Sequence, residues 1–160
     1  MDLNRLLTLL EEFEGKIAVL YENYAGRFSS DPDVSSVFRD LSTDELTHRD
    51  LIRYEKRVVM NDPKYFGNVD ADFALVEKMI SRVDAALDCC AETTPEDAIA
   101  LALEVESSAL EGMYKVVPAT AEPSFAKLFR AMHDGCSCHV SAVRELAGRR
   151  EAGESRQDAA

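Results

Sequence analysis

The sequence contains no tryptophan, only seven glycines and five prolines among 160 residues. It also lacks any run of about eighteen apolar residues, the length that a membrane-spanning helix needs. Because glycine and proline are the residues that most often interrupt regular elements, their scarcity favours long helices or strands. The N-terminal stretch, MDLNRLLTLLEEFEG, is acidic and amphipathic and is not typical of a secretion signal. We therefore expect a soluble, cytoplasmic protein with no membrane partner.

Basic residues are also in short supply. Lysine and arginine number 18 against 30 aspartates and glutamates, which gives a formal net charge of −12. Such a chain repels the phosphate backbone of nucleic acids and the anionic surfaces of membranes. We therefore expect no nucleic-acid partner.

Paired CxxC motifs are absent as well. The four cysteines form an adjacent pair, Cys89 and Cys90, and a pair separated by one residue, Cys136 and Cys138. Neither spacing is that of a zinc ribbon or a rubredoxin, and reduced thiols are the rule in the cytosol. The cysteines therefore predict neither a disulfide framework nor an electron-transfer domain of that kind.

Apolar residues recur every three or four positions along most of the chain, the period of an α-helix. Proline after a polar capping residue indicates a helix start in SSDPDV, at Pro32, and in TTPEDA, where Pro95 follows Thr94. The sequence predicts helices over about 3–28, 32–60, 70–91, 94–117 and 125–147.

These segments predict an all-α fold. Helices joined by short turns lie antiparallel, so the first two and the last two segments should form hairpins, connected by about 35 residues that contain a helix of their own. The simplest closed arrangement is a four-helix bundle with one long crossover, over residues 1–148. Residues 149–160 lack an apolar stripe and are expected to form a polar C-terminal tail.

Polar residues interrupt the apolar stripe of each bundle helix. Burying a charged carboxylate in a core without a partner costs roughly several kcal/mol of folding free energy. Otherwise the carboxylate is forced to take up a proton. The residue types at these positions are those that bind metal ions, namely Glu14, Glu45, His48, Glu106, Cys136 and His139.

Their heights along the bundle agree. Glu14 lies 17 residues before the first turn, taken at residue 31, and His48 lies 17 residues after it. Around a second turn at residue 121, Glu106 lies 15 residues before and Cys136 lies 15 after. At a rise of about 1.5 Å per residue, all six positions come to nearly the same level, so the chain reads as a diverged repeat that could place two metal ions between bridging carboxylates.

At these residues the sequence resembles the ferritin-like, rubrerythrin-type di-iron carboxylate proteins, over residues 3 to about 147. EGKIAVLYENYA is similar to the first helix of that family, FRDLSTDELTHRDLI to the second and ALEVESSALEGMY to the third. The last helix departs from the family at Cys136, where a glutamate is expected.

The resemblance implies a centre of two iron ions, with zinc as the alternative, that reduces peroxide or dioxygen or oxidises Fe(II). It also implies a homodimer and an external electron donor, since the chain has no rubredoxin-like domain. A non-enzymatic bundle that holds zinc, a single ion or none, and acts by association, is the second hypothesis.

Several residues have more than one interpretation. Cys136 is either a ligand or a small apolar core residue, because a thiolate cannot bridge two ions as a carboxylate does. If the site has lost its metal, the carboxylates would be satisfied by hydrogen bonds from Tyr21, Tyr114 or arginines. Glu111 or Asp134 could replace the missing carboxylate. His133 is expected at the surface, and Cys89 and Cys90 at a helix end.

Overall fold

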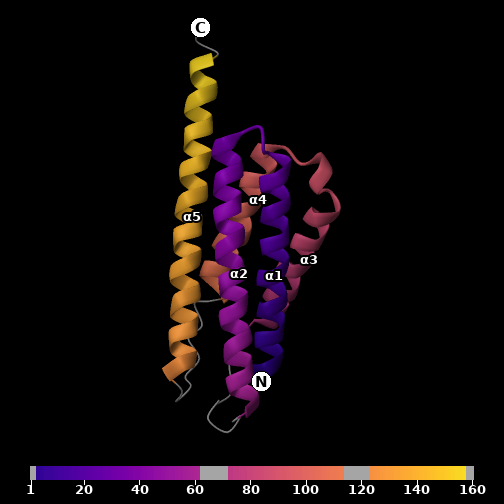
Figure 1. Ribbon diagram of the computed structural model, residues 1–160, viewed down its shortest axis with the longest axis vertical. Coiled ribbons are helices and arrows are strands. Elements are labelled where there is room, and N and C mark those ends of the chain that lie inside the picture. The colour runs from indigo at the N-terminus through magenta and orange to yellow at the C-terminus, as the bar shows by residue number, and fades with distance from the viewer. Residues whose placement is uncertain (1–2, 62–71, 114–122, 158–160) are drawn as a thin grey trace.

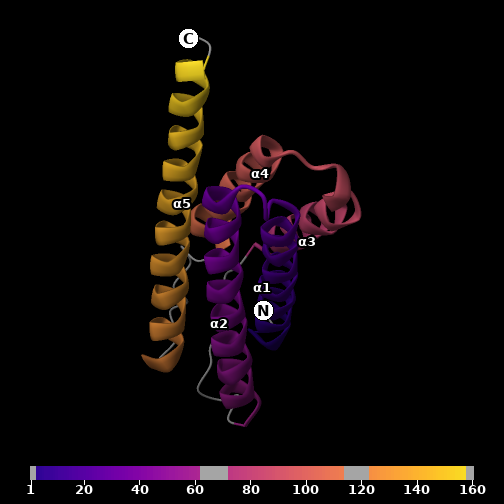
Figure 2. The same ribbon diagram turned by 45° about the horizontal axis from the view of Figure 1, so that its top comes forward.

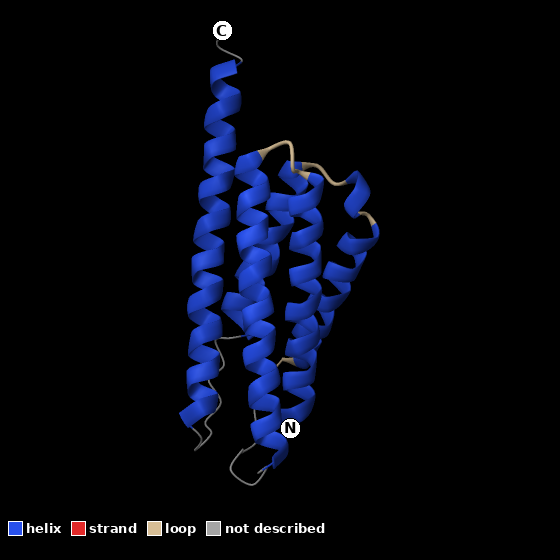
Figure 3. Ribbon diagram, viewed as in Figure 1, coloured by secondary structure: helices blue, strands red, loops and turns tan. Residues whose placement is uncertain are grey.

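The computed structural model describes residues 3–61, 72–113 and 123–157, and these residues form helices and no strand (Figure 3). The elements, in chain order, are α1 (Leu3–Arg27), α2 (Pro32–Asn61), α3 (Phe73–Asp88), the short 3-10 helix η2 (Cys90–Glu92), α4 (Pro95–Ser108), the π-helical turn η3 (Ala109–Met113) and α5 (Pro123–Gln157). The prediction of an all-α fold is confirmed.

The helices lie roughly along one direction. α1 packs against α2 on one side and α3 on the other, and α5 packs against α2 and α4 (Figures 1 and 2). α1 and α2 run in opposite directions, as do α4 and α5, while α3 lies on the side of α1 away from α2 and carries the chain from the first pair to the second (Figure 1). The crossover therefore contains its own helix, as predicted.

The predicted helix starts are confirmed by their caps. Pro32 begins α2, and the Asp31 carboxylate accepts a hydrogen bond from the Val34 amide at 3.3 Å. Pro95 begins α4, and the Thr94 hydroxyl accepts from the Asp97 amide at 3.2 Å. These contacts satisfy amides that have no partner inside the first helical turn.

The helices α3, α4 and α5 differ in extent or form from the predicted segments. α3 begins at Phe73 rather than near residue 70, and it ends at Asp88, before the adjacent cysteines. α4 widens into the π-helical η3 after Ser108. α5 continues to Gln157, ten residues past the end of its apolar stripe at Ala147. The predicted end of the fourth segment at Val117, and Tyr114, lie outside the described residues.

Salt bridges and hydrogen bonds hold that last part of α5 near the top of the bundle. Arg150 donates to the Asp31 carboxylate at 2.6 Å and to Glu96 at 3.0 Å, so one guanidinium contacts the α1–α2 turn and α4. These contacts explain why the helix does not end where its apolar residues do.

Small polar residues allow α1 and α2 to approach closely. The buried hydroxyls of Ser35 and Ser42 each donate to a backbone carbonyl of α1, those of Ala25 and Ala18, at 2.8 Å. Each serine therefore satisfies its own polar group while leaving room for the neighbouring backbone.

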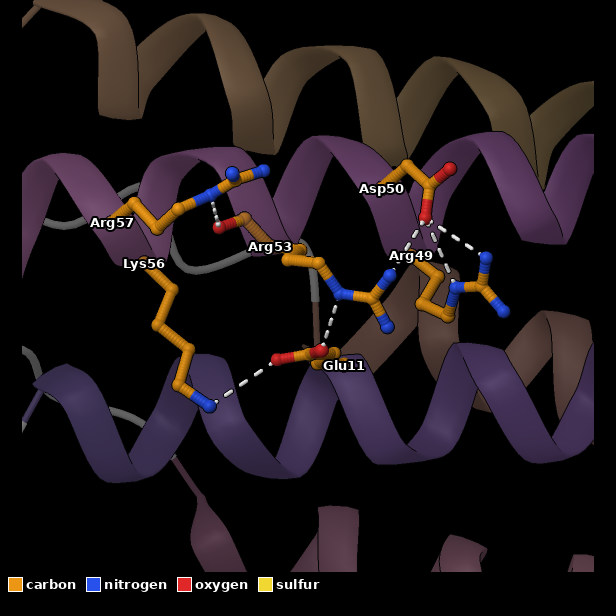
Figure 4. Close-up of polar contacts among 6 residues, drawn as sticks. All are labelled: Glu11, Arg49, Asp50, Arg53, Lys56 and Arg57. Carbon is orange, nitrogen blue, oxygen red and sulfur yellow. Dashed lines mark hydrogen bonds and ion pairs between the residues drawn. The ribbon is translucent and has the colours of Figure 1, made fainter.

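The outer surface of this helix pair carries a charged network (Figure 4). Glu11 of α1 accepts hydrogen bonds from Arg53 at 2.8 Å and from Lys56 at 3.2 Å, while Asp50 accepts from Arg49 at 2.9 Å. Because these side chains are all partly exposed to solvent, each pair contributes little, about 0–1 kcal/mol. The network fixes surface geometry and adds little to stability.

Apolar layers fill the interior above and below mid-height. Tyr21, Tyr24, Phe28 and Phe38 stack near the α1–α2 turn, with ring centres 5.2–6.4 Å apart. Phe125 and Phe129 form a second aromatic layer at the start of α5, with ring centres 4.8 Å apart. The predicted polar residues lie between these two layers.

Candidate metal centre

All six predicted ligand residues are buried in the interior, and they come from four helices. Glu14 lies on α1, Glu45 and His48 on α2, Glu106 on α4, and Cys136 and His139 on α5. Their exposed fractions run from 1% to 8%. The positions chosen from breaks in the apolar stripes therefore do face one another inside the protein.

Glu45 is the centre of the group. Its Oε2 lies 2.9 Å from Nδ1 of His48, which is one helical turn further along α2. Its Oε1 lies 2.9 Å from Nδ1 of His139 on α5. One carboxylate thus contacts both imidazoles, each through the nitrogen nearest the backbone.

Two further carboxyl groups flank this arrangement. Oε2 of Glu14 lies 3.8 Å from Nδ1 of His48, and Oε2 of Glu106 lies 3.2 Å from Nδ1 of His139. The Tyr21 hydroxyl donates to Oε1 of Glu106 at 2.7 Å. The prediction that Tyr21 hydrogen-bonds a buried carboxyl group is confirmed.

The closest group of potential ligand atoms in the described parts of the chain belongs to Glu45, His48 and His139. One atom from each lies within 4.8 Å of the other two, which makes this a group able to hold a metal ion. Glu14, Glu106 and Cys136 lie outside that closest group.

Cys136 is buried among the carboxyl groups, with 2% of its surface exposed. Burial, together with the charges of Glu106, Glu14 and Glu45, raises the pKa of its thiol far above the ordinary value. Without a metal ion, Cys136 therefore stays protonated at neutral pH.

Burial and mutual contact shift the pKa values of the central groups in different directions. Burial, and then the charge of Glu45, raises the pKa of Glu14 to about 8, so Glu14 is protonated at neutral pH and donates to Glu45. Burial and the charge of Glu106 would raise the pKa of Glu45, but hydrogen bonds from Glu14, His139 and His48 lower it.

The two imidazoles show the reverse balance. Burial alone would lower their pKa values, but hydrogen bonds to the surrounding carboxylates raise the pKa of His48 to about 10 and that of His139 to about 11. Without a metal ion, protons on the imidazoles provide the positive charge among the carboxylates.

The outer nitrogens of the two imidazoles have different surroundings. Nε2 of His139 lies 3.5 Å from the carboxylate of Asp44, whose side chain is 62% exposed. Nε2 of His48 faces Gly135 of α5, where a β-carbon would collide with the ring. Asp44 and Gly135 were not predicted, and no pattern in the sequence marks either residue.

The remaining candidates lie away from the centre. Glu111 is exposed, and Asp134 is an exposed residue 3.6 Å from the ring of His133, so neither replaces the missing carboxylate. His133 is at the surface, as predicted. Cys89 is exposed at the end of α3 and donates to the Ala85 carbonyl at 2.7 Å, which agrees with a helix-end role.

One buried carboxyl group was missed. Glu55 is only 3% exposed and follows His48 by seven residues on the same face of α2. Its Oε1 accepts a hydrogen bond from the Ser124 hydroxyl at the start of α5, at 2.6 Å. The sequence signal was its place on the stripe between Ile52 and Val59.

None of the described helices combines the length and the apolarity needed to cross a membrane. Comparison with known proteins finds no matching family model, no similar curated protein and no similar solved structure. The residues and geometry of the buried centre are therefore the basis for inferring a function.

Proposed function

We propose that this protein binds a redox-active transition metal, iron in the first place, at the buried Glu45, His48 and His139 group, and that the metal serves reduction of peroxide or dioxygen or oxidation of Fe(II). The observation that carries the proposal is that Nδ1 of both imidazoles meets the two oxygens of one buried carboxylate.

The donor set fits such an ion. Imidazole nitrogen and carboxylate oxygen are ligands that iron, manganese and zinc accept, and a pair of histidines with one carboxylate suits non-haem Fe(II). The hydrogen bonds in the described residues leave no buried side-chain nitrogen or oxygen without a partner. Protons can therefore satisfy the network, but a divalent cation offsets buried carboxylates without the need to keep Glu14 neutral.

When bound, iron would supply Lewis acidity and redox electrons that protein side chains lack. The chain's own residues have supporting tasks. Tyr21 holds Glu106 in place, and Asp44 is an exposed acceptor beside Nε2 of His139, where a proton can pass between the centre and solvent. The apolar layers on both sides limit the access of water.

The partners follow from the same proposal. Because the sequence holds no CxxC pair, electrons would come from an external donor. We also propose a homodimer, supported by two large apolar side chains one turn apart on α2, where Leu51 is 41% and Tyr54 is 61% exposed. Contiguous exposed apolar residues are typical of association surfaces.

The test is metal analysis of protein purified with and without oxygen, followed by peroxide addition to the Fe(II)-loaded form. We expect bound iron and a change in the absorption spectrum with consumption of peroxide. The Glu45→Ala variant should lose both, while His133→Ala should keep both because His133 lies at the surface. Protein with no bound iron and no response to peroxide would refute the redox function.

A second function is favoured by Cys136. A protonated thiol at the place of a bridging glutamate removes a ligand that redox pairs of iron ions use. The corresponding proposal is a non-enzymatic bundle that binds zinc, one ion or none, and works through association. Stable binding of zinc with no peroxide consumption by the iron form, in a protein that is dimeric by light scattering, would favour this function.

A further inference from the structure

We infer that Glu45, His48 and His139 hold a single metal ion between them, so that this chain binds one ion tightly where the sequence repeat suggests two. The inference rests on the proposed metal-binding function and specifies what the site takes. Its starting point is the distance between the two imidazole rings, whose centres are 5.3 Å apart with an angle of 34° between their planes.

This ring separation suits a shared ion. A metal ion about 2.1 Å from a ring nitrogen lies about 3.2 Å from the centre of that ring. Two rings on one ion then have centres about 4.6 Å apart at an octahedral angle and about 5.3 Å apart at a tetrahedral one. The observed separation of 5.3 Å falls at the end of that range. One ligand atom from each of Glu45, His48 and His139 also lies within 4.8 Å of the other two.

Glu45 occupies the position of the third ligand. Its two oxygens are each 2.9 Å from one of the Nδ1 atoms, so the carboxylate already lies between the rings. Two histidines and one carboxylate on one ion leave further coordination positions open. A small ligand such as dioxygen or peroxide could bind at those positions.

A second ion lacks a bridge. Pairs of ions in such bundles are joined by carboxylates that give one oxygen to each ion. Glu45 is one such group, but the matching position of the second hairpin holds Cys136, which has a single sulfur atom. Glu106 accepts a hydrogen bond from the Tyr21 hydroxyl at 2.7 Å, so this carboxyl group is already held by a donor and is less free to take a second ion.

The second hairpin departs from the first at the preceding residue too. Asp44 lies 3.5 Å from Nε2 of His139, which keeps the proton on that nitrogen and leaves Nδ1 for the metal. The matching residue before Cys136 is Gly135, which offers no carboxylate to His48. Gly135 and Cys136 are both on α5. The two residues that make the second hairpin unlike the first therefore lie next to each other on one helix.

The first experiment counts ions. Metal-free protein is titrated without oxygen with Fe(II), and separately with Zn(II), by calorimetry, and the metal that survives desalting is measured. We expect one ion per chain for either metal. Retention of two ions per chain would overturn the inference while leaving the proposed function intact. Retention of neither metal would overturn both.

Single-histidine variants distinguish a shared ion from two separate ones. If one ion is shared, His48→Ala and His139→Ala each retain none after desalting, whereas with separate positions each retains one. His133→Ala is the matched control and should keep one ion. Circular dichroism shows whether each variant is folded. If a variant is not folded, the number of ions retained by the unsubstituted protein decides between one shared ion and two separate ions.

Two substitutions test the role of Cys136. Cys136→Ser should still bind one ion, because the thiol is not a ligand, and loss of the ion would contradict this. Cys136→Glu should restore the second bridge and raise retention to two ions per chain. A folded Cys136→Glu protein that stays at one ion would contradict the reason given for the missing second ion.

Discussion

Replacing Gly135 with alanine should destabilise the protein through a collision with His48. A β-carbon at Gly135 would lie 2.6 Å from Cε1 of the His48 ring and closer still to its Nε2, well inside the roughly 3.5 Å at which carbon atoms make favourable contact. The imidazole would have to leave its position against α5, and its Nδ1 would leave Glu45. We therefore expect both stability and metal retention to fall.

Gly148 provides the control, because it lies in the same helix and an added β-carbon there meets nothing within 4 Å. Exchanging glycine for alanine inside a helix stabilises by about 0.5–1 kcal/mol when there is room. Both variants have this gain, but Gly135→Ala also carries the overpacking cost of about 1–3 kcal/mol. The two variants should therefore differ by about 1–3 kcal/mol in their free energy of unfolding.

Urea denaturation of the metal-free proteins, followed by fluorescence of the tyrosines and by circular dichroism, measures this difference. The metal retained after desalting is a second readout that should fall only for Gly135→Ala. If the two variants are equally stable and retain the same metal, His48 does not rest against the backbone of α5, and the geometry of the centre is wrong.

Three further predictions concern the surroundings of the centre. Tyr21→Phe removes the donor to Glu106 and should lower the free energy of unfolding by about 1–3 kcal/mol, measured by urea denaturation. Asp44→Asn should weaken metal binding about 10–100-fold with little change in stability, because Asp44 orients His139, and calorimetry measures this. Metal affinity should rise with pH up to about 100-fold per unit between pH 6.5 and 9, since the ion must displace protons from His48 and His139, whose pKa values are raised to about 10 and 11.

The first two predictions each have a control variant, and the third has a counterpart in the pH dependence of the metal-free protein. Tyr54→Phe, at a side chain 61% exposed, should leave stability unchanged, and an equal loss in both tyrosine variants would contradict the role of Tyr21. Asp40→Asn lies one turn before Asp44 on α2 and should bind metal normally. The stability of the metal-free protein should show the opposite pH trend. Raised histidine pKa values stabilise it fully below the ordinary value of 6.5, and this contribution is lost as the pH rises toward 10.

Apolar spacing predicted the helices because burial decides where they form. The long helices each present one mainly apolar face, and Pro32 after the cap Asp31 and Pro95 after the cap Thr94 mark two starts directly. The extension of α5 to Gln157 could not be predicted in this way. It depends on Arg150, whose partners Asp31 and Glu96 are distant in sequence, and a surface ion pair leaves no periodic pattern.

The buried glutamates and histidines could be predicted because each one interrupts an apolar stripe at a matched height. Asp44 could not be, since it is exposed and an acidic surface residue is ordinary in a chain of charge −12. Gly135 could not be predicted either, because the need for a glycine there depends on His48 of the facing helix, which is distant in sequence. Glu55 was missed because the comparison of heights looked only for groups of carboxyl and imidazole side chains. The partner of Glu55 is instead a hydroxyl, that of Ser124.

Cys136 shows why spacing alone leaves a centre of this kind undecided. A cysteine on a buried stripe is compatible with a ligand and with an apolar core residue, and the structure buries the Cys136 thiol among glutamates that keep it protonated. A neutral thiol at that position supplies no carboxylate, whereas a glutamate would supply one that could bridge two ions. The difference between one ion and two would then come from a single side chain. Serine in place of Cys136 should preserve this behaviour, and glutamate should not.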